Sequence, residues 1–153
     1  MKITKVKKET IPQLVDLMIG LADYEKLPRP DAAAVRRTRK ALLAENPSVY
    51  AMLAWDGKKP VGYAMYFYTF SSFLARPSFY LEDLFVLPEY RAHGYGKALF
   101  EKCVQTGKTK GCGRMEWCVL DWNEPAHKFY KKAGARKLNE WEYYRLKLRD
   151  DAF

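Results

Sequence analysis

The stretch LPEYRAHGYGKALF, residues 87–100, places an arginine and two glycines directly before a segment with helical spacing. Gly94 and Gly96 let a ligand approach the backbone closely, and the first N–H groups of a helix have no partner inside the helix. The helix N-terminus also carries partial positive charge, to which Arg91 and Lys97 add full charges. This pattern predicts a site for a phosphate or pyrophosphate, with a plain strand-to-helix turn as the alternative.

Two familiar phosphate-binding loops do not fit this stretch. A dinucleotide fingerprint needs a third glycine where the chain has Leu99, and a Walker loop needs Ser or Thr after Lys97, where the chain has Ala98. Classical dinucleotide and nucleoside triphosphate sites are therefore disfavoured.

Two adjacent carboxylates, Glu82 and Asp83 in YLEDLFV, lie on a strand-like segment that leads into the turn. Alternate side chains of a strand face opposite sides, so one of the two faces the sheet interior or a cleft. A carboxylate in a partly desolvated cleft has a raised pKa and can accept a proton from a reacting group. A surface carboxylate at a strand edge is the alternative interpretation.

The elements that must position these residues follow from the spacing of apolar residues. We expect helices over 9–26, 31–45, 94–110 and 124–133, and strands over 1–8, 48–55, 60–70, 78–88, 113–120 and 141–149. The strands near 80–87 and 113–120 are joined by a helix and should be parallel. This order predicts an α/β (α+β) fold, with a mixed, mostly antiparallel, twisted sheet and helices on both faces. Ligands in such sheets bind at the carboxyl ends of parallel strands, where the glycine turn lies.

Composition limits the class of protein. The 153 residues predict a single domain over 1–153, and 48% apolar with 29% charged residues is typical of a globular protein. The N-terminus has no secretory signal and no apolar run is long enough to span a bilayer, so we expect a cytoplasmic protein without a membrane partner. Three cysteines without C-x-x-C spacing, and His93 and His127 without metal-ligand neighbours, predict no metal site. The net charge of +9 indicates an anionic partner, which could be a nucleic acid, an anionic surface or an anionic cofactor.

At this point the chain shows a resemblance to a known family. LEDLFVLPEYRAHGYGKAL resembles the acetyl-CoA-binding motif of the general N-acetyltransferase (GNAT) superfamily, whose core [RQ]-x-x-G-x-[GA] is matched by Arg91, Gly94 and Gly96. NEPAHKFYKKAGA is similar to the second motif of that superfamily, matched by Asn123, Phe129, Tyr130 and Gly134. The stretches LADYEK, VGYAMYFYTFSSFLARPSFYLEDLFV and WNEP resemble the spermidine/spermine (diamine) and thialysine N-acetyltransferase branch. The match spans roughly residues 10–149, and it departs at Ala92, where that branch often has glycine.

The resemblance implies a GNAT fold in which two parallel strands splay apart, and an acetyl-CoA-dependent transfer to the primary amine of a small molecule. The amine is that of a polyamine or diamine, or of a lysine-like amino acid such as thialysine. By the same resemblance, Glu82 accepts the amine proton as general base, directly or through a water, and Tyr130 protonates the leaving thiolate as general acid. The transfer is direct, so Cys118 is expected to be a small core residue rather than a nucleophile.

The resemblance also assigns binding residues. Acetyl-CoA would be bound by Leu84, Phe85, Val86, Arg91, Ala92, His93, Gly94, Tyr95, Gly96, Lys97, Asn123, Ala126 and Tyr130. The amine pocket would be bordered by Tyr24, Glu25, Glu82, Asp83, Glu116, Trp117, Cys118 and Glu142. It further implies a homodimer, with the apolar segment WEYYRLKL as a suitable surface.

Two other functions stay open from the sequence. The basic residues of DAAAVRRTRKALLAEN would suit a nucleic-acid-binding module, although no RNA- or DNA-binding motif is present, so a nucleic-acid partner is not expected. The chain could also acetylate the amine of a protein or peptide.

Overall fold

A computed structural model describes residues 1–149 of the chain, which forms two compact units, 1–118 and a second that begins at Val119. The first unit contains helices α1 (Ile11–Glu25), α2 (Ala32–Leu43) and α3 (Tyr95–Thr109), and two short 3-10 helices, η1 (Lys8–Thr10) and η2 (Pro88–Tyr90). Its strands are β1 (Lys2–Lys5), β2 (Tyr50–Asp56), β3 (Lys59–Ser71), β4 (Arg76–Val86) and β5 (Arg114–Glu116). The second unit contains α4 (Glu124–Lys132). The expectation of a single domain over residues 1–153 stays a prediction.

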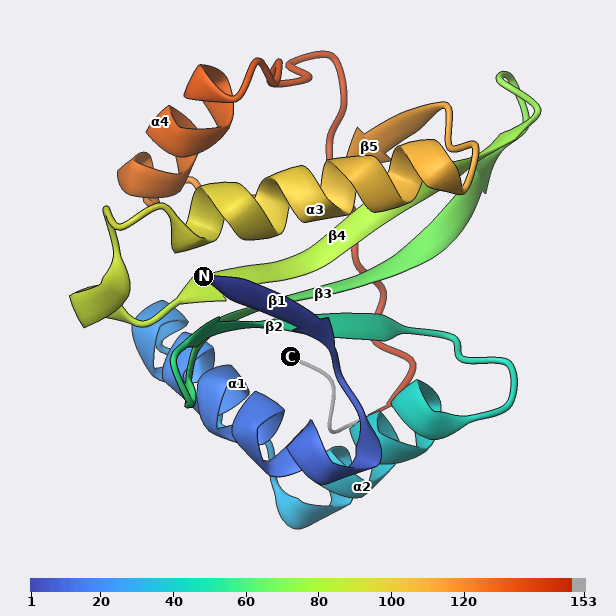
Figure 1. The fold of residues 1–153 in the computed structure, drawn as a ribbon. Coiled ribbons are helices and arrows are strands. Elements are labelled where there is room, and N and C mark those ends of the chain that lie inside the picture. The colour runs from blue at the N-terminus through green and yellow to red at the C-terminus, as the bar shows by residue number, and fades with distance from the viewer. Residues whose placement is uncertain (150–153) are drawn as a thin grey trace. The chain divides into compact units, whose positions relative to one another are not determined.

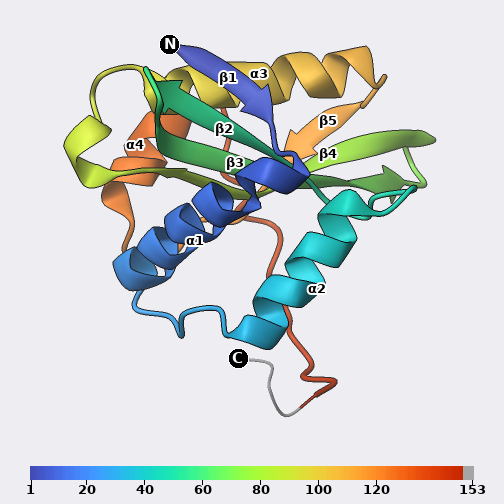
Figure 2. The same ribbon diagram turned by 60° about the horizontal axis from the view of Figure 1, so that its bottom comes forward.

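The five strands form one sheet in the order β1-β2-β3-β4-β5, and every neighbouring pair is antiparallel except the parallel pair β4–β5. In the first unit, α3 covers one face of the sheet, and α1 and α2 cover the other (Figures 1 and 2). The expected mixed, mostly antiparallel sheet with helices on both faces is therefore confirmed.

The parallel pair is short because its two strands separate. Pairing begins at Ser78↔Arg114 and ends at Tyr80↔Glu116, whereas β4 continues to Val86. The strand expected over 113–120 therefore ends at Glu116. Beyond this point β4 runs on without β5 beside it, which is the splayed arrangement that the resemblance implied.

A β-bulge in β4 changes which side chains share a face of the sheet. Met65 of β3 pairs with Asp83, but the next residue of β3, Tyr66, pairs with Leu81, so Glu82 is the extra residue. Because paired residues of antiparallel strands point to the same face, the odd-numbered residues of β4 switch faces at this position. Phe79 and Leu81 lie on the α3 face, whereas Asp83 and Phe85 lie on the α1 face.

Each face of the sheet has its own apolar packing. On the α1 face, Leu14 and Leu17 of the helix pack against Leu53, Tyr63 and Phe85 of the strands, and all five are buried. On the α3 face, the fully buried residues include Phe79, Leu81, Leu99 and Cys103. Full burial of a large apolar side chain stabilises a fold by ~1.5–3 kcal/mol, so these layers fix the sheet between its helices.

Helix starts agree with the residues that favour them. The Asp31 carboxylate accepts a hydrogen bond of 2.6 Å from the Ala34 backbone N–H at the start of α2. In the second unit, Asn123 caps α4 by accepting from the Ala126 N–H at 3.3 Å, and Pro125 lies in the first turn. No side chain caps α3, whose N-cap is Gly94.

The strand expected over 141–149 is wrong for the described part of the second unit, which forms no strand there. Apolar and polar residues do alternate in this segment. A strand also needs a neighbouring strand to pair with, and this segment pairs with none among the described residues. Its large apolar side chains are exposed, Leu148 by 87%. No helix in the described 149 residues combines the length and apolar character needed to cross a membrane.

Candidate active site

A buried hydrogen bond lies at the downstream side of the β4 bulge. The Tyr63 hydroxyl donates to Asp83 Oδ2 at 3.0 Å, and the Tyr63 side chain is only 1% exposed. Tyr63 is the diagonal cross-strand neighbour of Asp83, because Tyr63 itself pairs with Phe85. Sequence reasoning missed Tyr63. No glycine or proline marks the bulge that sets the β3–β4 register, so no local sequence signal points to the contact between Tyr63 and Asp83.

Three carboxyl groups influence one another at this place, and we call Glu25, Glu82 and Asp83 the acidic cluster. The pKa of Asp83 is raised to about 7, mainly by burial and also by the charges of Glu82 and Glu25, and the hydrogen bond from Tyr63 opposes this rise. Burial also raises the pKa of Glu25 at the end of α1. A carboxyl whose pKa is raised toward neutral suits a group that accepts and returns a proton.

The two predicted carboxylates of β4 have different environments. Glu82 is exposed, as expected for the extra residue of a bulge, whereas Asp83 is turned inward toward Tyr63. The prediction that one of the pair faces inward is thus confirmed. The inward residue is Asp83, whereas Glu82 is the one to which the resemblance gives the role of base.

The glycine turn holds a left-handed backbone at two residues. Ala92 has φ 64° and Gly94 has φ 86°, a region that glycine adopts freely and alanine only with strain. Position 92, where the related branch often has glycine, therefore holds an alanine in a strained backbone conformation. His93 closes the turn locally, with Nδ1 donating to the Arg91 carbonyl oxygen at 2.7 Å.

The Arg91 side chain turns back onto the protein. Its Nε donates to the Val86 carbonyl oxygen at 3.0 Å, and its guanidinium lies over the Tyr24 ring, 4.4 Å from the centroid. A cation stacked on an aromatic face is attracted by the ring. Arg91 therefore contacts both the end of β4 and the end of α1, and Tyr24 lies beside the turn.

The start of α3 fits an approaching anion. Gly96 lies within the helix, where glycine destabilises by ~0.5–1 kcal/mol relative to alanine. A Cβ at this position would meet only Val86 Cγ2, at an ordinary 3.8 Å, so nothing in the described protein needs a glycine there. A ligand that touches the backbone would need it, and the uncapped N–H groups of α3 offer that ligand donors. These features suit an approaching phosphate or pyrophosphate.

The neighbouring predicted cofactor residues have structural partners. Tyr95 is buried against Tyr90, with ring centroids 6.1 Å apart, and Lys97 forms an exposed ion pair with Glu101 at 3.7 Å. In β4, Phe85 and Val86 are buried and Leu84 is half-buried. Their backbone lies beyond the last β4–β5 pairing, on the length of strand where a ligand could take the place of β5.

Three predicted pocket residues lie at and just after β5. Glu116 forms an ion pair with Arg114, with Nε and Oε2 3.0 Å apart, and the Trp117 ring meets Phe100 edge-on at 5.5 Å. Cys118 is exposed, with Sγ 3.3 Å from the Tyr80 hydroxyl, so the expectation of a core cysteine is wrong. The reason is that the strand ends before residue 118, and its side chain no longer points into a layer.

The remaining predicted site residues belong to the second unit. Tyr130 and Phe129 of α4 have ring centroids 5.1 Å apart, and Ala126 donates to the cap residue Asn123. Glu142 is exposed and accepts from the Tyr144 hydroxyl at 3.0 Å. Among the residues that the structure describes, no three His, Cys, Asp or Glu side chains are grouped to hold a metal ion.

The splayed parallel pair and the glycine turn at a helix start are part of a fold that acetyltransferases share. The chain belongs to the acetyltransferase (GNAT) family, whose model matches residues 15–135, and it is an N-acetyltransferase. It is 32% identical over 155 residues to a thialysine N-epsilon-acetyltransferase of Sus scrofa, covering 94% of this chain and 91% of that protein. It is 31% identical to a human spermidine/spermine N(1)-acetyltransferase-like protein 1, covering 88% of this chain and 20% of that protein.

Solved structures show the same fold. The crystal structure of a probable acetyltransferase superposes with a TM-score of 0.86 at 22% identity, covering 99% of this chain and all of that one. The expected family and its diamine and thialysine branch are thus confirmed. Members of this family use acetyl-CoA as acetyl donor.

Proposed function

We propose that the protein transfers the acetyl group of acetyl-CoA directly to a primary amine of a small molecule. A lysine-like amino acid such as thialysine is the first candidate, and a polyamine or diamine the second. The observation that supports this proposal is the acidic cluster beside the glycine turn. In a chain of net charge +9, a local group of carboxyls is what would attract a cationic amine.

The amine arrives protonated, because an alkyl amine has a pKa near 10, and it must lose a proton before it reacts. Glu82 is our proposed general base, acting directly or through a water, because it is the exposed carboxyl of the cluster. Asp83 lies behind it, half-buried and held by Tyr63. We propose that Asp83 supports the base by sharing the proton, so that the pair returns to its starting charge in each cycle.

Acetyl-CoA, when bound, supplies the acetyl group as a thioester that a neutral amine attacks. The backbone of residues 91–97 and the start of α3 would hold its pyrophosphate, and β4 beyond Tyr80 would hold its pantetheine arm. Tyr130 is the proposed general acid, and Asn123 and Ala126 are proposed to lie along the arm. Tyr24, Glu25, Glu116, Trp117, Cys118 and Glu142 are proposed to border the amine.

The choice between lysine-like and polyamine substrates rests on the relatives and on one contact. The most completely covered relative reported above is a thialysine N-epsilon-acetyltransferase, whose named substrate carries a carboxylate as well as an amine. Arg29 is held by Asp23 in a two-pronged ion pair of 2.7 and 2.9 Å, so it is already neutralised. This contact reduces the positive charge near the end of α1, so it keeps a polyamine or diamine as the second candidate, whereas the relatives support the lysine-like amino acid as the first.

The test is release of free CoA from acetyl-CoA with thialysine, lysine, spermidine and putrescine as acceptors. We expect the highest kcat/KM for thialysine. A preference for spermidine or putrescine would reverse the order of the two substrate classes. No turnover with any of the four would contradict the proposed small-amine function and direct attention to peptide amines.

A further inference from the structure

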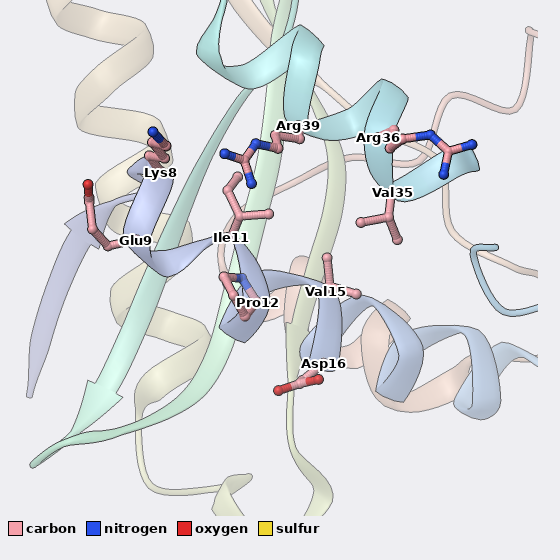
Figure 3. Close-up of a pocket in the computed structure, with 9 residues that line it drawn as sticks. All are labelled: Lys8, Glu9, Ile11, Pro12, Val15, Asp16, Val35, Arg36 and Arg39. Atoms are coloured by element: carbon pink, nitrogen blue, oxygen red, sulfur yellow. The ribbon is translucent and has the colours of Figure 1, made fainter. Parts of the chain in front are cut away.

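A pocket lies between the start of α1 and the middle of α2, and none of its lining residues is among those assigned to acetyl transfer (Figure 3). It is a wide hollow of about 710 Å³ that is largely open to solvent. All of its lining belongs to the first unit of the chain. The proposed function therefore leaves this pocket unexplained.

The interior of the pocket is apolar. Ile11, Pro12 and Val15 line it from α1, and Val35 lines it from α2. Figure 3 shows Val15 and Val35 directed toward each other from the two helices. Ile11 is almost fully buried at 4% exposure, so it forms a floor that continues into the protein. An apolar group of a ligand would be removed from water here.

Cations stand at the edge of this apolar surface. Arg39 extends from α2 over Ile11 toward Lys8 of η1, while Arg36 extends in the opposite direction (Figure 3). Within the described residues, no ion pair or side-chain hydrogen bond engages Lys8, Arg36 or Arg39. An arginine and a lysine that converge without a partner form an attractive place for a carboxylate or a phosphate.

Two acids also border the pocket, and they do not neutralise these cations. Asp16 points away from both arginines, and Glu9 points away from Ile11 (Figure 3). Neither acid forms an ion pair within the described residues. The basic run around 36–40 is likewise divided, because Arg36 and Arg39 line the pocket whereas Arg37 and Lys40 do not. A divided run does not form the continuous track that a nucleic acid strand needs.

We propose that this pocket binds a small amphipathic anion, with a single carboxylate or phosphate between Arg39 and Lys8 and an apolar chain against Ile11, Val15 and Val35. The charge at the edge and the apolar floor complement the two ends of such a molecule. The site shares no lining residue with the acetyl-transfer residues, so the inference stands whether or not the proposed substrate is right.

Calorimetric titration of the full chain with octanoate, octyl phosphate and 1-octanol tests the proposal. Both anions are expected to bind at least about tenfold more tightly than the neutral alcohol, since the charged head contacts two cations. The anion with the higher affinity would show whether the pocket prefers a carboxylate or a phosphate. Equal affinity for 1-octanol and the anions would overturn the proposal.

Three variants locate the binding. Arg39→Gln and Val35→Asp are each expected to weaken octanoate binding about tenfold or more, the first by removing the cation and the second by placing a like charge on the floor. Lys40→Gln changes the same charge one residue further along α2 without lining the pocket, and should leave affinity within about twofold. All three should keep the thermal midpoint and the affinity for acetyl-CoA. An Arg39→Gln protein that binds octanoate as the parent does, or an oligonucleotide that competes for the site, would refute it.

Discussion

At the scale of single residues, the most informative finding is that two adjacent acids of β4 have separate environments. Glu82 is exposed at the bulge, and Asp83 faces inward with its carboxylate 3.0 Å from the Tyr63 hydroxyl. The two acids look equivalent in the sequence. In the structure only Glu82 is accessible to a substrate, whereas burial raises the pKa of Asp83.

Replacing the proposed base is expected to slow the reaction. Glu82→Gln keeps the size of the side chain but cannot accept a proton, so kcat should fall by roughly 10²–10⁴. Because Glu82 is exposed, the thermal midpoint should be retained. Glu101→Gln is the matched control on the exposed side of α3, and a Glu82→Gln protein as fast as this control would remove Glu82 from the mechanism.

The proposed acid is tested in the same way. Tyr130→Phe removes only the hydroxyl, so the leaving thiolate would lose its proton donor and kcat should fall by about 10² or more. The helix and its Phe129 contact should remain. Tyr143→Phe removes an exposed hydroxyl from the same unit and is expected to keep full turnover; equal rates for both variants would contradict the role of Tyr130.

The Tyr63 hydrogen bond should be visible in the pH dependence of turnover. This bond lowers the pKa of Asp83, and burial together with the charges of Glu82 and Glu25 outweighs it, for a net pKa of about 7. Tyr63→Phe removes it, so the pKa should rise further and the acid limb of the kcat/KM profile should move to higher pH. Tyr68→Phe, on the opposite face of β3, is the control. A profile that stays in place would show that Asp83 does not share the proton.

Asp83 should also make stability depend on pH. Its folded-state pKa of about 7 lies above the ordinary value of 3.8, so the folded protein binds the proton more tightly than the unfolded chain does. The stabilisation is complete below about pH 4 and is lost as the pH rises through 7. Relative to the parent, Asp83→Asn should therefore gain about 2 kcal/mol of unfolding free energy between pH 5 and pH 8. Denaturant unfolding at both pH values measures this, with Asp121→Asn as a control that should gain nothing.

At the scale of elements, the turn between β4 and α3 has one glycine that the backbone needs and one that it does not. Gly94 is left-handed, whereas Gly96 sits in the helix with room for a Cβ. The sequence motif names both glycines but cannot separate these two reasons for a glycine. The motif also could not reveal that Arg91 packs on Tyr24, since residues 24 and 91 are brought together only by the packing of α1 on the sheet.

Gly96→Ala separates a role in binding from a role in folding. The methyl group meets only Val86 Cγ2 at 3.8 Å, and alanine favours the helix, so the midpoint of unfolding should stay the same or rise. The same methyl group would stand where a pyrophosphate approaches, so affinity for acetyl-CoA should fall about tenfold or more. Titration calorimetry decides this, and unchanged affinity would show that the ligand does not touch this turn of the helix.

At the scale of the whole molecule, the order and type of most elements could be predicted, because apolar periodicity and caps such as Asp31 and Asn123 are local signals. The length of β5 and the absence of a described strand over 141–149 could not, because a strand depends on a partner that periodicity does not identify. The glycine turn was found for its motif, whereas Tyr63 was missed because its role depends on the β3–β4 register.

We propose that the protein is a homodimer. The second unit exposes Trp141, Tyr144, Leu146 and Leu148 by 73–87%, which is a large amount of apolar surface for a monomer. Light scattering on a size-exclusion column should give twice the chain mass, and the double change Leu146→Lys and Leu148→Lys should give the monomer. A parent protein that elutes as a monomer would contradict this.

The extra residue in β4 also decides how the chain tolerates insertions and deletions. Removing Glu82 would restore regular pairing with β3, yet it would place either the upstream or the downstream half of the strand with its apolar side chains toward the wrong layer. Loss of this one residue is therefore expected to damage the architecture, whereas Glu82→Gln affects only chemistry. A position that looks like an ordinary catalytic acid is at the same time a spacer, and for the fold its presence matters more than its identity.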